Sequence, residues 1–456
     1  MSKYKAYPEY KDSGVEWLGE IPSSWDMWKL SHAYEAIGSG TTPTSSNELW
    51  FQGDIPWVTT GELRETVIND TFKKVSSFTL QTFSALKIHP AGSIVIAMYG
   101  ATIGRLGILG VDATTNQACC VMTKSNIVNN QYLYYWLQAF REDVIKLSSG
   151  GGQPNINQEK VASLKISSPA WNDQATIVCF LNHETAKIDN LIKKQQQLIE
   201  LLKEKRQAVI SHAVTKGLDP DVPMKDSGVE WLGDVPAHWD ICLLKFKCSA
   251  ITDGAHISPD TNEGEHYFVS IKDIKKGIID FNNSLLTSSA SYKYLVKTGC
   301  KPFSGDILFS KDGTIGQTAI VPDDVDFVVA SSLIIIRADK EKTLPAFMDL
   351  LLQSSLVKEQ VESFVKGAAL RRLSIQNLEK VFGIFPTLSE QQIISDYIYA
   401  QLNRLDVLES KAVVQIQLLE ERRTALISAA VTGKIDVRDW VAPDTQDVEE
   451  PQEATA

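Results

Sequence analysis

Few residues in this chain have the types and spacing that catalysis requires. Gly100-x3-Gly104-x2-Gly107 resembles a nucleotide-binding loop only in its glycines, because no strand–helix unit with an acidic residue at the required distance follows it. Pro322-Asp323 matches the first half of a metal-dependent nuclease motif, but Asp339-Lys340-Glu341 does not supply the second half. His256 and His266 lack a third ligand at regular spacing, so we interpret them as polar loop or surface residues.

Other catalytic motifs are absent from the sequence. It contains no Pro-Pro pair, and therefore no Asn/Asp-Pro-Pro-aromatic motif of the kind that holds a flipped base in an amino-methyltransferase. It has no GxxxxGK[ST] loop and no HExxH pair. A chain without evident catalytic chemistry suggests a recognition protein.

The elements that would position the residues of such a protein are two long helices. Apolar residues recur at alternating steps of four and three from 172 to 217, a pattern typical of a helix that packs against another helix. The predicted seam is Ile177, Leu181, Ile188, Leu191, Leu198, Leu202 and Val209, interrupted by Glu184, Gln195 and Lys205. Asn172 is the expected N-cap, and Gly217 followed by Pro220 the expected end. The helix would be roughly 65 Å long.

A second copy of this helix lies later in the chain. A shift of 217 positions places Gln174 on Gln391, Asp189 on Asp406, and Ala213-Val214-Thr215 on Ala430-Val431-Thr432. The second copy opens with Ser389-Glu390-Gln391-Gln392, which we interpret as a capping box. We therefore expect the two helices to pair.

A shorter repeat precedes each globular segment. The nine residues from Lys11 to Gly19 recur unchanged from Lys225 to Gly233, and Trp25-Asp26 recurs as Trp239-Asp240. Because these anchors carry no catalytic pattern, we expect their tryptophans to pack where a globular domain joins the helices.

The two globular segments show the same order of elements. In the first, we expect strands at 55–58, 93–97 and 118–122 and a helix at 131–147. In the second, the corresponding strands are at 266–271, 305–309 and 333–336 and the helix at 344–364. The loops differ, most clearly between 151–155 and 368–372, as expected for related modules with different ligands.

Bulk composition limits the class of protein. No run of 18 apolar residues predicts a membrane span, and the first residues lack a signal-peptide core. The six cysteines form no CxxC pair, so we expect neither a disulfide framework nor a metal site, and a cytoplasmic location. The net charge of −11 gives little basis for binding nucleic acid, although part of it comes from a tail that has six acids and no base from Asp439 onward.

These repeated motifs resemble those of the specificity (S, HsdS-type) subunits of type I restriction-modification systems. The resemblance rests on the anchor Lys11–Gly19, on Lys203–Ala208, on Val214–Leu218, on Tyr99–Gly104 and on Thr252–His256, and it covers nearly the whole chain apart from the acidic tail. It implies an α/β fold with two similar α+β target recognition domains, separated by two long helices that form an antiparallel coiled coil with a pseudo-twofold repeat. The expected segments are an anchor at 1–26, recognition domain 1 at 27–170, a helix at 171–217, a second anchor at 218–240, recognition domain 2 at 241–387, a second helix at 388–436 and a disordered acidic tail at 437–456.

The resemblance also implies a function. Each domain would read one half of a bipartite, asymmetric site in double-stranded DNA, and the helices would set the gap and dock two methyltransferase subunits. Two restriction subunits would complete the complex. This chain would hold no cofactor, because S-adenosylmethionine belongs to the adenine-N6 methyltransferase partner, and ATP and Mg belong to the restriction partner.

Base contacts are expected from polar side chains on loops, because the edges of bases in the major groove need paired donors and acceptors. On this hypothesis the glycine loop at Gly100 is a turn or faces DNA. The residues expected to bind DNA are Thr41, Thr42, Thr59, Thr60, Tyr99, Arg105, Gln153 and Asn155 in domain 1, and Asp253, His256, Lys272, Lys311, Asp312, Lys366, Arg371 and Arg372 in domain 2.

Two other classes of function stay open at this stage. A self-sufficient DNA-modifying enzyme with a degenerate active site would bind its cofactor as the purified chain alone. A coiled-coil scaffold with two protein-binding domains would not bind DNA even beside a methyltransferase partner.

Overall fold

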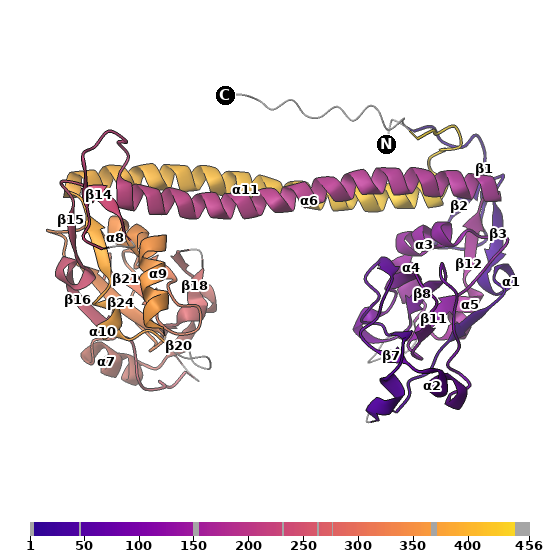
Figure 1. Ribbon diagram of the computed structural model, residues 1–456, viewed down its shortest axis with the longest axis horizontal. Coiled ribbons are helices and arrows are strands. Elements are labelled where there is room, and N and C mark those ends of the chain that lie inside the picture. Colours follow the sequence, from indigo (N-terminus) through magenta and orange to yellow (C-terminus); the bar gives the residue numbers. More distant parts are fainter. Residues whose placement is uncertain are drawn as a thin grey trace. The chain divides into compact units, whose positions relative to one another are not determined.

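The computed structural model describes residues 4–44, 47–148, 155–229, 232–261, 264–275, 277–365 and 372–442. The chain forms two compact units (Figure 1). Unit 1 comprises residues 1–194 and 415–456, and unit 2 comprises residues 195–414. Each unit therefore contains one globular domain and part of both long helices.

Unit 1 is built on a five-stranded sheet of order β4-β11-β8-β9-β6 and a three-stranded sheet of order β10-β5-β7. Two strand pairs, β1-β2 and β12-β3, complete it. Its strands are β1 (Tyr10–Asp12), β2 (Glu20–Pro22), β3 (Asp26–Lys29), β4 (Ile37–Ser39), β5 (Ile55–Val58), β6 (Thr66–Ile68), β7 (Lys74–Val75), β8 (Ile94–Ala97), β9 (Leu106–Leu109), β10 (Thr114–Thr115), β11 (Cys119–Met122) and β12 (Lys165–Ser168). Its short helices are α1 (Leu30–Ala33), η1 (Glu48–Phe51), α2 (Ser77–Thr82), η2 (Gly100–Thr102), α3 (Asn130–Ala139), α4 (Arg141–Lys146) and α5 (Gln158–Ser163).

Unit 2 has a four-stranded sheet of order β16-β24-β21-β22 and a three-stranded sheet of order β20-β17-β23, with the pairs β13-β14, β15-β25 and β18-β19. Its strands are β13 (Met224–Asp226), β14 (Asp234–Pro236), β15 (Asp240–Leu243), β16 (Cys248–Asp253), β17 (His266–Val269), β18 (Ile274–Lys275), β19 (Ile278–Ile279), β20 (Leu285–Thr287), β21 (Ile307–Ser310), β22 (Thr318–Ile320), β23 (Phe327–Val329), β24 (Leu333–Ala338) and β25 (Phe382–Phe385). Its short helices are η3 (Leu244–Lys247), η4 (Ile271–Asp273), η5 (Phe281–Asn283), α7 (Ser289–Lys297), α8 (Pro345–Leu352), α9 (Ser355–Phe364) and α10 (Ile375–Leu378).

The two globular domains share one topology. In each, a parallel strand pair, β5 with β10 or β17 with β23, lies in a small sheet that also holds one antiparallel strand. In each, the central antiparallel strands follow the same order, β4-β11-β8-β9 or β16-β24-β21-β22. The predicted common order of elements is therefore confirmed, and the six predicted strands correspond to β5, β8, β11, β17, β21 and β24.

The single helix predicted after these strands is wrong in both domains, because the structure has two helices there. In unit 1 the chain breaks at Phe140, whose φ of −105° and ψ of 20° end α3. In unit 2 it breaks at Ser354, whose hydroxyl accepts a hydrogen bond from the Val357 amide and starts α9. In unit 2 a local cap thus overrides the hydrophobic periodicity, whereas in unit 1 Phe140 makes no side-chain cap and its backbone conformation ends the first helix.

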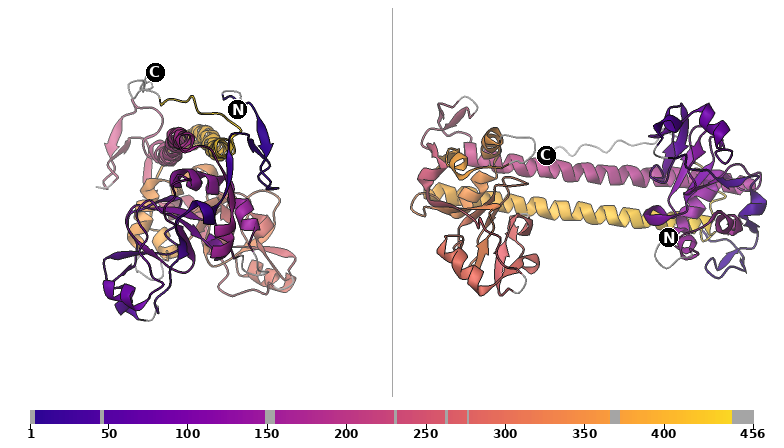
Figure 2. Two further views of the ribbon diagram at one scale, coloured as in Figure 1. Left: turned by 90° about the vertical axis from the view of Figure 1, so that its right-hand side faces the viewer. Right: turned by 90° about the horizontal axis from the view of Figure 1, so that it is seen from below.

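The long helices are α6 (Trp171–Lys216) and α11 (Leu388–Val431), and they run antiparallel (Figure 2). In unit 1 the first part of α6 lies beside the last part of α11, where Arg423 Nε donates to Asp189 Oδ1 at 2.8 Å. In unit 2 Arg206 pairs with Asp406. Since a shift of 217 positions converts one ion pair into the other, both pairs specify the same register. Exposed ion pairs add little stability, so their contribution is to orientation and register.

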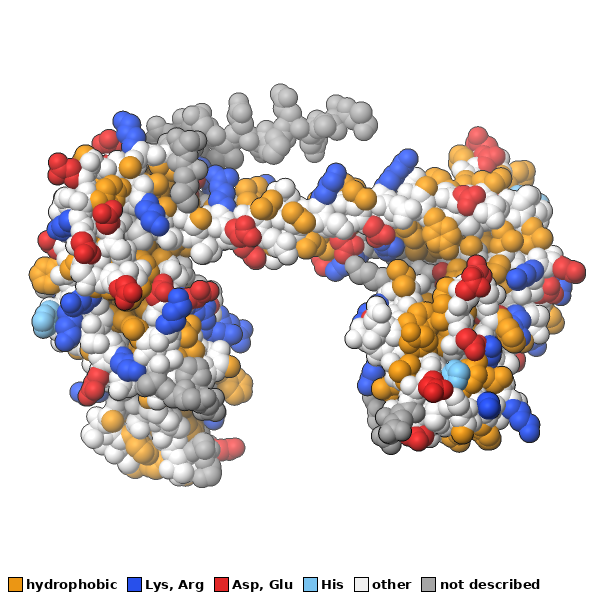
Figure 3. Space-filling view, turned by 180° about the vertical axis from the view of Figure 1, so that it is seen from behind, with side chains coloured by type: hydrophobic (Ala, Val, Ile, Leu, Met, Phe, Trp, Pro, Cys, Tyr) orange, Lys and Arg blue, Asp and Glu red, His pale blue; other side chains and the backbone are white. Residues whose placement is uncertain are grey.

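The predicted seam of α6 is wrong by one residue at four of its ten positions and right at the other six. The less exposed residues of the helix recur at the same four-three steps, but Thr185, Ile192, Ile199 and Arg206 replace Glu184, Leu191, Leu198 and Lys205. Leu191 is 47% exposed and Leu198 is 40% exposed, and Figure 3 shows hydrophobic side chains on the surface of the helices. Because Leu191-Ile192 and Leu198-Ile199 are adjacent apolar pairs, the pattern of apolar residues alone does not choose between the two seams.

A fully buried glutamine joins each long helix to its domain. The Gln174 side-chain amide donates to Ile127 O (2.9 Å), Ser168 Oγ (2.8 Å) and Pro169 O (2.9 Å), and its oxygen accepts from Asn129 N (2.7 Å). Gln391 repeats the arrangement in unit 2, where its oxygen accepts from Leu344 N at 2.8 Å and its amide donates to Pro386 O at 2.9 Å. Each glutamine thus satisfies the backbone of the segment before α3 or α8, which explains its repetition in the sequence.

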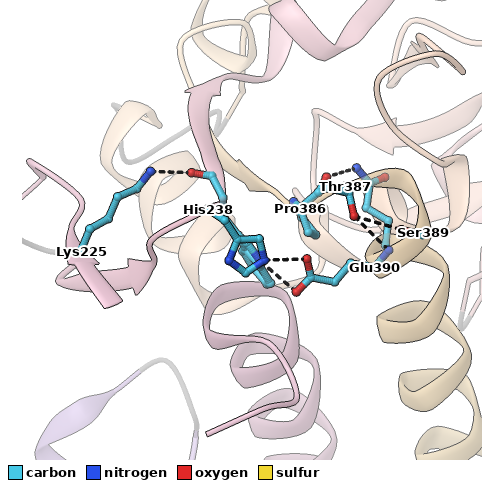
Figure 4. Close-up of polar contacts among 8 residues, drawn as sticks. Lys225, His238, Pro386, Thr387, Ser389 and Glu390 are labelled. Carbon is cyan, nitrogen blue, oxygen red and sulfur yellow. Dashed lines mark hydrogen bonds and ion pairs between the residues drawn. The ribbon is translucent and has the colours of Figure 1, made fainter. Parts of the chain in front are cut away.

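The predicted N-terminal caps of the long helices are wrong, whereas α6 ends at Lys216, directly before Gly217, as predicted. Helix α6 begins at Trp171, so Asn172 lies inside it, and α11 begins at Leu388, with the Thr387 hydroxyl accepting from Glu390 N at 3.4 Å. The Gln392 side chain does not complete a capping box with Ser389, because its Nε2 donates to Asp396 Oδ1 at 2.9 Å. Figure 4 shows the Glu390 side chain facing His238, and its two oxygens lie 2.9 Å from His238 Nε2 and 3.0 Å from Trp239 Nε1. Helix α11 is thereby linked to the second anchor.

The anchors are β-hairpins that pack against helix ends, as predicted. In unit 1 Trp25 is buried beside Gly433, the residue with a φ of +72° that follows α11. In unit 2 Trp239 is buried beside Gly217, which follows α6 with a φ of +78°. A side chain at either glycine would be strained by the left-handed backbone and would contact the anchor.

A buried carboxyl lies in the core of unit 2. Asp349 of α8 is 6% exposed, and Gln353 Nε2 donates to its Oδ2 at 2.8 Å. Burial raises the pKa of Asp349 from its usual 3.8 to about 6. A carboxyl group with a raised pKa contributes most to the free energy of unfolding at low pH. This contribution is lost as pH rises through about 6.

Replacing Gln174 by leucine is expected to destabilise unit 1 by about 3 kcal/mol, because the Asn129 amide and the Ile127 and Pro169 carbonyls lose their fully buried partner. Urea unfolding, with amide hydrogen exchange to localise the effect, measures the loss. The matched control is Gln196→Leu, at an exposed position of the same helix. Equal effects of the two substitutions would contradict the assigned role of Gln174.

Asp349→Asn is expected to stabilise unit 2 at pH 8 by about 3 kcal/mol relative to its effect at pH 4, since a shift of one pKa unit corresponds to ~1.4 kcal/mol. Unfolding measured across this pH range tests the sign. Glu359→Gln, at an exposed position on α9, is the control. A pH dependence that Asp349→Asn leaves unchanged would refute the assignment.

Candidate nucleic-acid interface

The predicted DNA-binding residues of unit 1 lie on loops that meet at one end of the domain. Thr41 and Thr42 follow β4, and Thr59 and Thr60 follow β5. Thr42 Oγ1 donates to Gln117 Oε1, which links the first loop to the residues that follow β10. Asn116 N donates to Val58 O at 2.9 Å, and Gly40 N donates to Thr115 Oγ1 at 3.1 Å.

The close approach of these loops requires glycine at one position in each domain. A Cβ on Gly40 would lie 1.7 Å from Thr115 O, and a Cβ on Gly254 would lie 2.0 Å from Ala330 O. The loop after β4 or β16 therefore crosses directly over the loop after β10 or β23. The two loops lie so close together that no side chain fits between their backbones at Gly40 or Gly254.

Tyr99, Arg105 and Asn155 belong to the same end of unit 1. Tyr99 and Asn155 form an antiparallel bridge, and the preceding Met98 accepts a backbone hydrogen bond from Ile156 at 3.0 Å. Arg105 follows η2, and its carbonyl accepts from Ala97 N at 2.9 Å at the end of β8. The glycine-containing segment at Gly100 is a short 3-10 helix in this loop.

The predicted residues of unit 2 meet in the same way. Asp253 ends β16, where its carboxylate pairs with the Lys311 ammonium and lies 2.9 Å from His256 Nε2. Lys311 N donates to Ser332 O at 3.0 Å, and Ser332 Oγ accepts from Ile271 N, next to Lys272. Asp312 and Arg372 form an antiparallel bridge and an ion pair of 3.2 Å.

Burial separates these residues into two groups. The Lys311 side chain is only 4% exposed, so its ammonium holds Asp253 in place and does not reach the surface. Lys272 and His256 are exposed, and the Arg372 side chain is 53% exposed. Gln153, Lys366 and Arg371 lie outside the described residues.

Sequence reasoning missed a carboxylate that orders one loop in each domain. Glu62 Oε2 accepts from both Thr59 N, at 2.8 Å, and Thr59 Oγ1. Asp273 Oδ2 accepts from Ser270 N at 2.7 Å and from Ser270 Oγ at 3.0 Å. The spacing Thr-x-x-Glu and Ser-x-x-Asp directly after a buried strand is the signal that could have revealed them. Gln117 and Ser332 were also missed.

Possible metal ligands do not cluster in the described part of the chain. There, no three His, Cys, Asp or Glu side chains are grouped as metal ligands would be. His256 contacts Asp253, whereas His266 stacks on Tyr292 with ring centroids 3.9 Å apart. The six cysteines are free, and none of the described helices has the length and apolar character that a membrane span needs.

Lys311→Met is expected to destabilise unit 2 by about 2 kcal/mol, because it leaves the largely buried Asp253 carboxylate without its cation. Lys272→Met, on the exposed face of the same loop cluster, should leave the free energy of unfolding unchanged. Urea unfolding of the two variants distinguishes the buried lysine from the exposed one. Equal stability of both variants would contradict a positioning role for Lys311.

Comparison with known proteins identifies the family. A family model described as the type I restriction modification DNA specificity domain matches residues 22–201 and again 246–416. The chain is 26% identical over 457 residues to the type I restriction enzyme MjaIX specificity subunit of Methanocaldococcus jannaschii, covering 96% of this chain and 99% of that one. It is 24% identical to the EcoR124I/EcoR124II specificity subunit of Escherichia coli, over 50% of this chain and 49% of that one.

Solved structures share the fold. A chain from a study of complex assembly and conformational transition of the type I R-M system aligns with a TM-score of 0.70 and 14% identity, over 91% of this chain and 99% of that one. The HsdS subunit from Thermoanaerobacter tengcongensis aligns with a TM-score of 0.52 and 14% identity, over 91% and 98%. Since the two matched segments of the family model make up most of the sequence, this chain belongs to the family of type I restriction-modification DNA specificity proteins.

Proposed function

We propose that this chain is the sequence-reading subunit of a type I restriction-modification complex and that each globular domain reads one half of a bipartite, asymmetric DNA site. One observation carries the proposal. Two domains of the same topology present different polar loops at equivalent ends, and the same two helices, α6 and α11, continue through both units. Helices of this kind set a distance between two readers, as half-site spacing does in dimeric repressors.

The chemistry is assigned to partner proteins. Two adenine-N6 methyltransferase subunits would carry S-adenosylmethionine, and two restriction subunits would carry ATP and Mg. The helices and anchors would dock the methyltransferase subunits, and apolar side chains on the helix surface, such as Leu201 (60% exposed) and Val407 (53% exposed), provide contact area for them. This chain would contribute no catalytic group.

The charge of the chain supports a contribution of the partner subunits to DNA binding. The net charge is −11, and basic and acidic side chains are mixed on the face seen in Figure 3. Phosphate contacts dominate the affinity of DNA-binding proteins and make it depend on salt. The methyltransferase subunits would therefore supply much of the phosphate contact. Full affinity and a steep salt dependence for the isolated chain would contradict this.

The test is to co-express the chain with its methyltransferase partner and to map methylated adenines in the host genome by single-molecule sequencing. The expected result is a split motif with one methylated adenine in each half and a constant gap. A single undivided motif would contradict the two-reader proposal. A soluble complex that methylates nothing would favour a scaffold.

Shortening both helices by one heptad is expected to shorten the gap and to leave the half-site bases unchanged. The matched deletion removes 192–198 from α6 and 409–415 from α11, which are equivalent under the shift of 217 positions. Seven helical residues correspond to about 10 Å, or about 3 base pairs. The methylation map of the variant measures the gap.

The control is a quadruple substitution at exposed helix positions, Gln196→Ala, Gln197→Ala, Ser410→Ala and Lys411→Ala, which should leave the gap as it is. Altered bases with an unaltered gap would refute the spacer role.

A further inference from the structure

The residues that precede α5 and α10 occupy equivalent positions in the two domains. Asn155 lies two residues before Asn157, which caps α5, and Arg372 lies two residues before Ser374, which caps α10. The residue between them, Ile156 or Leu373, is buried in the core. Its amide donates to Met98 O at 3.0 Å or to Lys311 O at 2.9 Å. Asn155 and Arg372 are therefore exposed residues, and each directly precedes a residue whose backbone is hydrogen-bonded and whose side chain is buried.

Each of these residues faces one partner across an antiparallel bridge. Asn155 is bridged to Tyr99, and Arg372 is bridged to Asp312. The two bridges are equivalent, because Tyr99 follows Met98 after β8, and Asp312 follows Lys311 after β21. The same backbone frame thus carries a neutral pair in unit 1 and an ion pair in unit 2.

The chemistry of the two pairs matches different base pairs. In the major groove guanine presents two acceptors and cytosine one donor, so a guanidinium beside a carboxylate complements a G·C pair. The ion pair uses Nε of Arg372, and a guanidinium has further N–H donors for a base. Adenine presents an acceptor and a donor, which suit the Asn155 amide, and the Tyr99 ring suits the thymine methyl group.

We infer that these two bridged pairs are one base-reading position used twice, selective for an A·T pair in unit 1, through Tyr99 and Asn155, and for a G·C pair in unit 2, through Asp312 and Arg372. The inference rests on the proposed function and adds to it which residues determine specificity. The side chains are placed for this role. Asn155 is exposed, and the side chains of Arg372 and Asp312 are 53% and 33% exposed.

Exchange of the pairs tests the inference. One variant carries Asp312→Tyr with Arg372→Asn, and the other carries Tyr99→Asp with Asn155→Arg. Each is co-expressed with the methyltransferase partner, and its methylation motif is mapped beside that of the wild-type complex. The expected result is a change from G·C to A·T at one position of one half-site in the first variant, and from A·T to G·C at one position of the other half-site in the second. The gap and the remaining positions stay as in the wild type.

The control removes a different ion pair of unit 2. Lys301 pairs with Asp326, which precedes β23 and so lies at the opposite end of that strand from the loop at Ala330. Lys301→Ala with Asp326→Asn should leave the motif unchanged. An unchanged motif in both exchange variants would overturn the inference, and so would a change at several positions in both halves.

A conservative variant covers the case in which an exchanged complex does not assemble. Arg372→Lys keeps the positive charge but loses the planar fork of donors, so discrimination at one G·C position should fall by about 10- to 100-fold. Undiminished discrimination in Arg372→Lys would also overturn the inference. A wild-type complex without a split motif would instead refute the proposed function, so the two failures are distinguishable.

Discussion

The fold depends on a buried glutamine at the start of each long helix. The side chains of Gln174 and Gln391 each hydrogen-bond to two separate segments of the chain, and each satisfies donors and acceptors that would otherwise be buried without partners. An apolar residue fills the same volume but leaves those groups unpaired, and a charged residue pays the larger penalty of burial. The direction in which a helix leaves its domain is therefore tied to one amide side chain.

The loops at the other end of each domain can differ in sequence because backbone atoms hold most of their contacts. The loops that carry the predicted DNA-binding residues are held mostly by backbone atoms, such as Gly40 N, Met98 O and Lys311 O. A carboxylate three residues after Thr59 or Ser270 adds a side-chain contact in each domain. Backbone hydrogen bonds do not depend on side-chain identity. The side chains at the outer positions can therefore change from neutral to charged while the frame that carries them stays the same.

Much of this organisation is visible in the sequence, and the failures have identifiable causes. The 217-residue repeat, the anchors and the buried strands follow from identity and hydrophobicity, which are properties of single residues. The seam of α6 was misplaced because Leu191-Ile192 offers two adjacent apolar choices, and only the partner helix decides between them. Ser354 was not predicted to break a helix because its capping bond depends on local backbone geometry. The pairing of Lys311 with Asp253 joins residues 58 positions apart, which no local pattern reveals.

The same pairing bears on how affinity and specificity are divided in the proposed function. Two cations in the described loops of unit 2 are compensated, Lys311 by Asp253 and Arg372 by Asp312. A compensated cation adds little to long-range attraction of phosphate, yet its donors and the neighbouring acceptor keep their directions. Such a surface discriminates between bases better than it attracts a duplex. A reader of this kind gains from partners that supply the attraction, because sequence preference is then not masked by tight binding to every sequence.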